Sequence, residues 1–535
     1  MRSLVCLICI FSSIIPGLAQ TYLSNIFKLD EEFAIFTESV WDNDTLYVTG
    51  NSGVFGVSYK ATIIKFAQNG SYISHVSLPD ASNAYNFGFW NKGLLIDSGT
   101  IVHTAAKGLA VDDEIEGMMI KADLNGNFLD SVSFKNFYSG VKLVDFRSFE
   151  KLTDGYVIAE LSWKDHQNAQ SCLLRLDESF NVVWRRCYGN ESKEMPVQVF
   201  ALSNGHFVVL SNSTDLDNTG IFRGSGNAYH RGYIFEVDTD GNLVWEWRSP
   251  NLIEATSAGY LENDTTLLVA SGMGVEECSD PNNPLANCQF WWTGGVYKFN
   301  LKTREKSWET RLSGGDAAPM FDNSHLDIMP SIERDGYIIC GAGYGLIPDC
   351  RTDTIDKCWT NPGVIGKISN EGDSLWLRKY YGVTDIIESN RLVDAEITPD
   401  GGYSFVGEAF NGWPGDDQGQ FGWLLMTDSF GCMVPGCQLI SSTESSPERN
   451  EILISPMKIY PVPASDVINV LITASLPESA TIHLSNALGQ EIDSWHSFEI
   501  GATYSIPVDH LAPGLYFMVM TDGNAVISTQ QVLVR

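Results

Sequence analysis

One pattern recurs seven times between residues 33 and 433 and constrains the fold more than any other feature of the sequence. Each copy contains a turn, an apolar run that ends in small residues, and an alternating run that leads into a polar tip. Asn-Gly and Asp-Gly pairs at several tips supply the positive φ that tight hairpins need. The tips lie 54 to 69 residues apart, at Gly70, Gly126, Phe180, Gly241, Thr303, Gly372 and Gly431.

Each copy therefore predicts four antiparallel strands, the last of which carries Trp in most copies. A single four-stranded sheet cannot bury both of its faces, so seven such sheets must stack around an axis. The sequence predicts an all-β chain with a seven-bladed β-propeller over residues 20–437. We interpret the outer-strand tryptophans as packing between blades, because a quinone cofactor would need a stack of Trp along the axis.

The two ends of the repeat region are incomplete in complementary ways. The seventh copy breaks off in the sequence GCMVPGC at 431–437, before any fourth strand. Residues 21–30 form a spare alternating run ahead of the first copy. We predict that this run supplies the missing outer strand of the last blade and closes the ring.

Residues 1–19 are typical of a secretory signal peptide, with one Arg, an apolar core and the small-residue ending Gly17-Leu18-Ala19. No later segment is long and apolar enough to span a bilayer, so no transmembrane segment is predicted. Residues 438–455 are rich in Ser and Glu, which predicts a flexible linker. The net charge of −32 opposes binding to nucleic acid or anionic lipid.

Nine of the eleven cysteines lie after the predicted leader. Close spacings in an exported protein predict disulfides. Cys340 is left over inside an apolar run, which indicates a buried free thiol. The predicted pairs are Cys172 with Cys187, Cys278 with Cys288, Cys350 with Cys358, and Cys432 with Cys437.

Residues 456–535 contain about seven short alternating runs separated by turn residues, which is typical of a small immunoglobulin-like β-sandwich. This segment also resembles the C-terminal sorting domain of type IX secretion cargo, although Val462 stands where that family usually has Asn. The repeat body resembles the propeller-like region common in such cargo. The matching residues of the sorting motif are Pro461, Pro463, Gly489, Gln490, Gly514, Tyr516 and Arg535.

The resemblance implies passage through the periplasm and recognition of the C-terminal domain by the type IX translocon. The mature protein is then expected in the medium or on the outer cell surface.

No catalytic residues emerge from the sequence. Its nine histidines form no close pair, and no sequence motif that would carry a catalytic nucleophile follows a strand. The long insertions in the fourth to seventh copies instead place aromatic residues near one rim. Aromatic side chains on loops that disulfides hold in place suit the binding of a sugar or a protein partner. The alternative is that Trp292 and Trp423 are buried at the starts of strands. The candidate binding residues are Tyr229, Phe290, Trp291, Trp292, Trp359, Trp413 and Trp423.

Asp215 and Asp217 begin like a calcium loop, but Gly226 occupies the position where an EF-hand requires Glu. Calcium is therefore kept as one alternative to a plain polar turn, and no other cofactor is predicted.

The sequence favours a non-catalytic binding or adhesion module for a glycan or a surface protein. Two alternatives stay open: a polysaccharide-degrading enzyme that uses acidic residues on the loop-rich face, and a structural surface component.

Overall fold

The computed structural model of this chain contains strands alone among its described residues. The described residues are 23–29, 33–54, 58–77, 85–86, 92–107, 114–135, 142–163, 169–189, 193–214, 231–251, 254–278, 288–312, 327–343, 345–346, 359–382, 388–411, 419–433, 457–460, 464, 466–472, 480–486, 491–498, 500–512, 514–522 and 525–534. The chain divides into two compact units, Met1–Gly345 with Thr360–Met433, and Leu346–Trp359 with Val434–Arg535. No helix in the described part is long and apolar enough to cross a membrane.

The strands of the first unit pair into sets of four, which we number as blades 1 to 7. Blade 1 contains β2 (Phe33–Asp42), β3 (Thr45–Val54), β4 (Ser58–Ala67) and β5 (Tyr72–Ser77). Blade 2 contains β7 (Leu94–Asp97), β8 (Thr100–Lys107), β9 (Glu114–Asp123) and β10 (Phe128–Phe134). Blade 3 contains β11 (Lys142–Leu152), β12 (Gly155–Trp163), β13 (Ala169–Asp177) and β14 (Val182–Tyr188).

Blade 4 contains β15 (Lys193–Ala201), β16 (Phe207–Thr214), β17 (Arg231–Val237) and β18 (Leu243–Arg248). Blade 5 contains β19 (Glu254–Asn263), β20 (Thr266–Cys278), β21 (Cys288–Asn300) and β22 (Glu305–Arg311). Blade 6 contains β23 (Asp327–Pro330), β24 (Gly336–Ala342), β27 (Gly363–Ser369) and β28 (Ser374–Tyr380). Blade 7 contains β29 (Glu388–Ile397), β30 (Tyr403–Asn411), β31 (Gly419–Thr427) and β1 (Leu23–Phe27).

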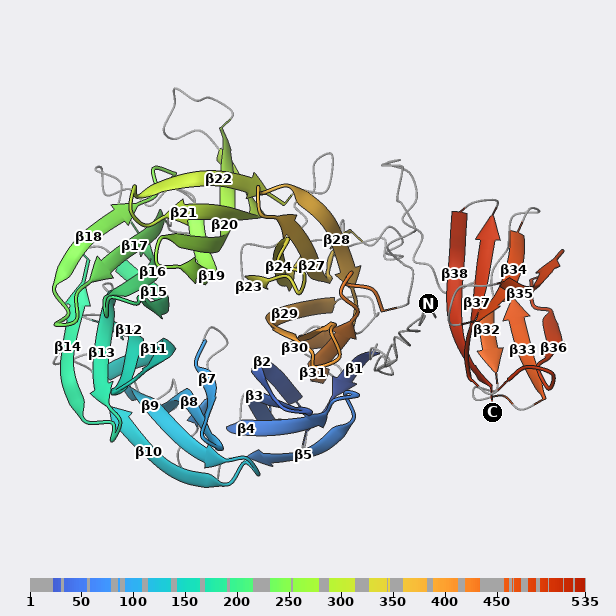
Figure 1. The fold of residues 1–535 in the computed structure, drawn as a ribbon, viewed down its shortest axis with the longest axis horizontal. Coiled ribbons are helices and arrows are strands. Elements are labelled where there is room, and N and C mark those ends of the chain that lie inside the picture. Colours follow the sequence, from blue (N-terminus) through green and yellow to red (C-terminus); the bar gives the residue numbers. More distant parts are fainter. Residues whose placement is uncertain are drawn as a thin grey trace, which may run out of the picture. The chain divides into compact units, whose positions relative to one another are not determined.

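Figure 1 shows these sets arranged in a ring, with the first strand of each set facing the centre. Three short strands lie outside the sets: β6 (Tyr85–Asn86) pairs with β8, β26 (Trp359–Asn361) pairs with β29, and β25 (Gly345–Leu346) lies next to β26. The predicted all-β, propeller-type fold is confirmed.

The first strand of the chain completes the last blade. β1 pairs antiparallel with β31, from Leu23 opposite Met426 to Phe27 opposite Gly422. Leu23 and Phe27 pack against a buried cluster that combines residues of blades 1 and 7. The prediction that residues 21–30 supply the missing outer strand is therefore confirmed, with the strand itself at 23–27.

The outer-strand tryptophans contact the hairpin tip of the next blade. Trp184 on β14 donates from Nε1 to the carbonyl oxygen of Thr239 at 3.0 Å. Trp308 on β22 donates in the same way to Asn370 at 3.1 Å. Packing between blades thus explains these side chains.

The tip glycine Gly241 is required twice over, because its φ is +77° and a Cβ there would lie 3.0 Å from the Trp184 ring. We expect Gly241→Ala to destabilise the protein by about 1–2 kcal/mol for the left-handed backbone alone, plus the cost of displacing the indole. Gly99→Ala is the matched control, since Gly99 has φ +79° and a Cβ added there would meet no atom within 4 Å. Urea denaturation should show the larger loss for Gly241→Ala, and equal losses would contradict the contact.

The second unit contains two sheets that bury one common cluster. One sheet consists of β32 (Met457–Tyr460), β33 (Val467–Ile472) and β36 (Thr503–Pro507). The other consists of β34 (Ala480–Asn486), β35 (Glu491–His496), β37 (Gly514–Asp522) and β38 (Ala525–Val534). Alternate residues of both sheets, such as Val470, Ile482 and Met518, are fully buried in the shared cluster. The immunoglobulin-like character of this sandwich stays a prediction.

The predicted domain boundaries near residues 19, 437 and 455 lie outside the described residues, as do the leader and the linker 438–455. They stay predictions.

Candidate functional site

Only part of the aromatic rim that the sequence predicts lies within the described residues. Tyr229 and Trp413 lie outside the described residues, and the backbone alone is described at Phe290, Trp291, Trp292 and Trp359. Trp423 is fully buried on β31, and its Nε1 donates to Ser24 Oγ at 3.0 Å. Trp423 is therefore a core residue, and its assignment to an exposed binding rim is wrong.

The predicted ion and sorting residues fall mostly outside the described part. Asp215 and Asp217 do so, and among the described residues no group of three or more His, Cys, Asp or Glu side chains is placed to hold a metal ion. Pro461, Pro463, Gly489, Gln490 and Arg535 are also outside it. Gly514 begins β37, and Tyr516 on the same strand is buried, with its hydroxyl donating to the carbonyl of Ala512 at 2.8 Å.

The longest hairpin of the ring lies in blade 5. β20 and β21 have 13 residues each, whereas the two middle strands of every other blade have 7 to 10. Their register runs without a shift from Thr266 opposite Asn300 to Cys278 opposite Cys288. The pairing of β19 with β20 ends at Met273, and that of β22 with β21 ends at Gly295.

Residues 274–278 and 288–292 therefore form a two-stranded arm beyond the four-stranded sheet; we name it the blade 5 arm. It carries Phe290, Trp291 and Trp292 opposite Glu276, Val275 and Gly274. Its backbone also places Cys278 directly opposite Cys288, as their predicted disulfide requires.

Polar side chains gather around the axis because the inner strands share a local irregularity. Five inner strands have a β-bulge at the same point, just before Glu38, Ser148, Gln198, Ala258 and Asp394. A bulge re-aims the side chain that follows it. Four of these five residues, together with Asp327 of β23, accept a hydrogen bond from a backbone N–H of the next blade.

We name these five acceptors, Glu38, Ser148, Gln198, Asp327 and Asp394, the axial ring. The donors are Gly93 to Glu38 Oε2 (2.8 Å), Val199 to Ser148 Oγ (2.8 Å), Gly259 to Gln198 Oε1 (3.0 Å), Ala395 to Asp327 Oδ2 (3.1 Å) and Ser39 to Asp394 Oδ2 (2.9 Å). The last bond joins blade 7 to blade 1, so the ring spans the point where the repeat region closes. Its residues stabilise the joints between blades.

One lysine lies against two carboxylates of the axial ring and neutralises part of their charge. Lys92 Nζ lies 2.7 Å from Asp394 Oδ1 and 3.2 Å from Asp327 Oδ2. Burial by itself lowers the pKa of Lys92, but the surrounding carboxylates outweigh that effect and the net pKa is raised. Burial raises the pKa of Glu38 to about 8 and also raises the pKa of Asp394. Burial lowers the pKa of His103, whose Nε2 is 3.7 Å from Glu38, to about 3.

The axial ring was missed in the sequence because its members sit in ordinary-looking strands. Glu38, Gln198 and Asp394 stand in the runs FTESV, PVQVF and LVDAE, ahead of the turns that reveal the repeat. Aligning the repeats by the strand before each turn would have placed these polar residues at one position.

The cysteines follow the predicted pattern where they are described. Cys172 and Cys187 form a disulfide between β13 and β14, and Cys340 is a buried free thiol, so both predictions are confirmed. Cys432 is disulfide-bonded, and its predicted partner Cys437 lies outside the described residues, as do Cys350 and Cys358.

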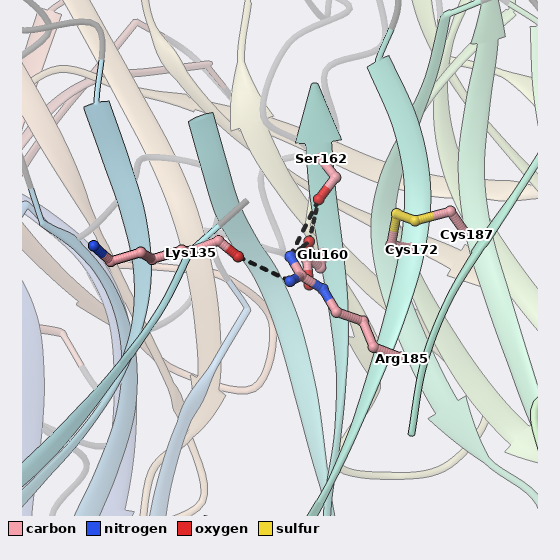
Figure 2. The surroundings of a disulfide bond; sticks show 6 residues. All are labelled: Lys135, Glu160, Ser162, Cys172, Arg185 and Cys187. Carbon is pink, nitrogen blue, oxygen red and sulfur yellow. Dashed lines mark hydrogen bonds and ion pairs between the residues drawn. A yellow bond between two sulfur atoms is a disulfide. The ribbon is translucent and has the colours of Figure 1, made fainter. Parts of the chain in front are cut away.

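Figure 2 shows the disulfide beside an ion pair within blade 3, whose arginine also donates a hydrogen bond to blade 2. Arg185 on β14 donates from Nε to Glu160 Oε2 at 2.8 Å and from Nη1 to the carbonyl oxygen of Lys135 at 2.8 Å. Glu160 is fully buried and also contacts the hydroxyl of Ser162. The disulfide therefore fixes the strand that carries this arginine.

We expect the double variant Cys172→Ala/Cys187→Ala to lose about 3 kcal/mol of stability, since the bridge closes a loop of 15 residues. Guanidinium denaturation of the parent and the variant measures the loss. Cys340→Ala is the control for replacing a buried sulfur without cutting a cross-link. A double variant as stable as the parent would contradict the structural role of the bridge.

Comparison with known proteins bears on the two units separately. Residues 458–535 match the model of the secretion system C-terminal sorting domain. No curated protein matches the chain.

The solved structures that resemble the chain include hydrazine synthase of Kuenenia stuttgartiensis, at 11% identity over 69% of this chain and 92% of that one, with a TM-score of 0.39. They also include the β-propeller domain of the trilobed protease from Pyrococcus furiosus, at 10% identity over 75% of this chain and 97% of that one, with a TM-score of 0.35.

Proposed function

We propose that this protein, a type IX cargo with a propeller-type body, is a non-catalytic binding or adhesion module. The sorting domain at 458–535 implies recognition by the type IX machinery and export to the outer surface or the medium. The proposed ligand is a glycan or a surface protein. The observation that carries the proposal is the blade 5 arm.

The arm adds little to the core of its blade, because neither the inner nor the outer strand pairs with it. A strand pair that extends beyond its sheet, yet carries three consecutive aromatic residues, needs another reason for that composition. Aromatic side chains give a large contact area at a small cost in conformational entropy, and this suits recognition of a ligand. The opposed Cys278 and Cys288 would pin the end of the arm.

The axial ring lends no support to the catalytic alternative. A glycosidase needs two carboxyl groups that reach the scissile bond. Glu38, Asp327 and Asp394 are buried, and each already accepts a backbone N–H from the next blade. These carboxylates therefore support the fold, and the polysaccharide-degrading alternative gains nothing from them.

Binding of the purified full chain to a glycan array and to outer-surface protein extracts tests the proposal. We expect the variant Phe290→Ser/Trp291→Ser/Trp292→Ser to bind the recovered ligand about 30-fold or more weakly, as for a central aromatic anchor. Tyr72→Ser/Ile73→Ser is the control, because these exposed apolar residues lie on β5, away from the arm. Repeating the assay with a chelator tests calcium at Asp215 and Asp217.

Equal binding by the arm variant and the parent would contradict the role of the arm. Release of reducing ends from polysaccharides by the parent would overturn the non-catalytic proposal in favour of the enzyme.

A further inference from the structure

Lys92 connects parts of the ring that are not neighbours. Its backbone is held by blade 3, since its N–H donates to the carbonyl oxygen of Arg147 at 2.6 Å and its carbonyl accepts from Phe149 at 3.3 Å. Its ammonium group is held by blades 6 and 7 through Asp327, Asp394 and the carbonyl oxygen of Val393 at 3.2 Å. The side chain therefore reaches from the blade 2–3 side of the axis to the opposite side.

Asp394 takes part both in the contact with Lys92 and in the contact that joins the last blade to the first. Its Oδ1 accepts from Lys92, and its Oδ2 accepts from both the N–H and the hydroxyl of Ser39, at 2.9 and 2.7 Å. Ser39 belongs to the first blade and Asp394 to the last. One carboxylate thus serves the closing joint and the bridge across the axis.

Lys92 offsets the electrostatic cost of burying the Asp394 carboxylate at the joint between the first and last blades. Asp394 is 5% exposed and lies close enough to Asp327 for the charge of that carboxylate to act on it. Removing the cation that lies against this carboxylate would leave like charges buried together, which is strongly unfavourable. Loss of Lys92 should therefore loosen the joint between Asp394 and Ser39 first.

We propose that Lys92 acts as a cross-axis clamp that holds the first and last blades together from inside the ring. The clamp uses no residue of β1, so it closes the ring independently of that strand. β1 closes it at the outer edge of blade 7, and Lys92 closes it at the axis. Damage to one closure leaves the other in place.

Hydrogen exchange of the full chain, followed by mass spectrometry of its peptides, tests the clamp. Lys92→Met keeps the apolar stem and removes the charge. We expect about tenfold faster exchange in the peptides 33–42 and 388–397, which contain the amides of Ser39 and Ala395. Exchange in 193–201 and 254–263, which contain the equivalent donors Val199 and Gly259, should stay unchanged.

Lys306→Met is the matched control. Lys306 is as exposed as Lys92, at 18% of its side chain, and its Nζ also lies 2.7 Å from a buried carboxylate, Glu254, but both residues belong to blade 5. It should leave the peptides 33–42 and 388–397 unchanged.

Asp394→Asn gives a second test if Lys92→Met does not fold, because Asn keeps an oxygen for the Ser39 amide while the ion pair is lost. The same two peptides should exchange faster. The proposal is overturned if they exchange as in the parent, or if exchange rises equally in all inner strands, since that pattern would mean general destabilisation.

Discussion

Replacing Trp423 by alanine is expected to lower the free energy of unfolding of the propeller by about 3–5 kcal/mol. The indole is fully buried, and a Cβ at Gly363 would lie 2.5 Å from it. The ring therefore fits only because residue 363 is a glycine. Alanine would leave a cavity, and Ser24 would lose its hydrogen bond from Nε1. Because Ser24 lies on β1, the cavity also weakens the attachment of the closing strand.

Urea denaturation of the full chain, followed by far-ultraviolet circular dichroism, measures this effect. Ser24→Ala is the control, because it removes the hydrogen bond and keeps the packing; it should cost about 1 kcal/mol. If Trp423→Ala unfolded at the same urea concentration as the parent, the indole would not be filling the core as described.

Stability is expected to fall as the pH rises from 5 to 8, and Glu38→Gln is expected to remove much of that fall. The pKa of Glu38 is raised by burial to about 8 in the folded chain, against an ordinary value of 4.5. Between these two pH values the folded chain binds more protons than the unfolded chain. The stability linked to this proton is therefore complete below the ordinary pKa and is lost as the pH rises toward the folded pKa.

One proton changes stability by at most about 1.4 kcal/mol per pH unit, so Glu38 accounts for a loss on the order of 4 kcal/mol across this range. Glutamine keeps an oxygen for the Gly93 amide but cannot ionise. Urea midpoints at half-unit pH steps for the parent and for Glu38→Gln measure the difference. Glu178→Gln, at an exposed hairpin tip, is the control. Parallel pH profiles of stability for the parent and for Glu38→Gln would contradict the raised pKa of Glu38.

The features that the sequence predicted correctly depend on the repeat length or on turns that are local in the chain. The hairpin tips, the spare run at 21–30 and the pair Cys172–Cys187 each follow from a repeat length or from symmetry about one turn, and β1 and the disulfide are found as expected. The sorting tail was predictable for the same reason, since its motifs are local.

The features that the sequence did not reveal depend on contacts between distant strands. Asp394 and Ser39 are 355 residues apart and meet only when the ring closes. The bulge that aims Asp394 at this joint leaves no mark in a run such as LVDAE. Trp423 was ambiguous because an aromatic residue near the start of a strand has the same sequence environment whether it faces solvent or a neighbouring blade.

The direction of β1 has a mechanical consequence. Leu23 lies opposite Met426, so the chain enters β1 and leaves β31 at the same end of one antiparallel pair. Tension applied to the two chain ends would load the five residue pairs one after another, as a zipper is opened, and would never load them together in shear. This outer closure therefore yields to a modest pull on the two chain ends, because its residue pairs separate one at a time.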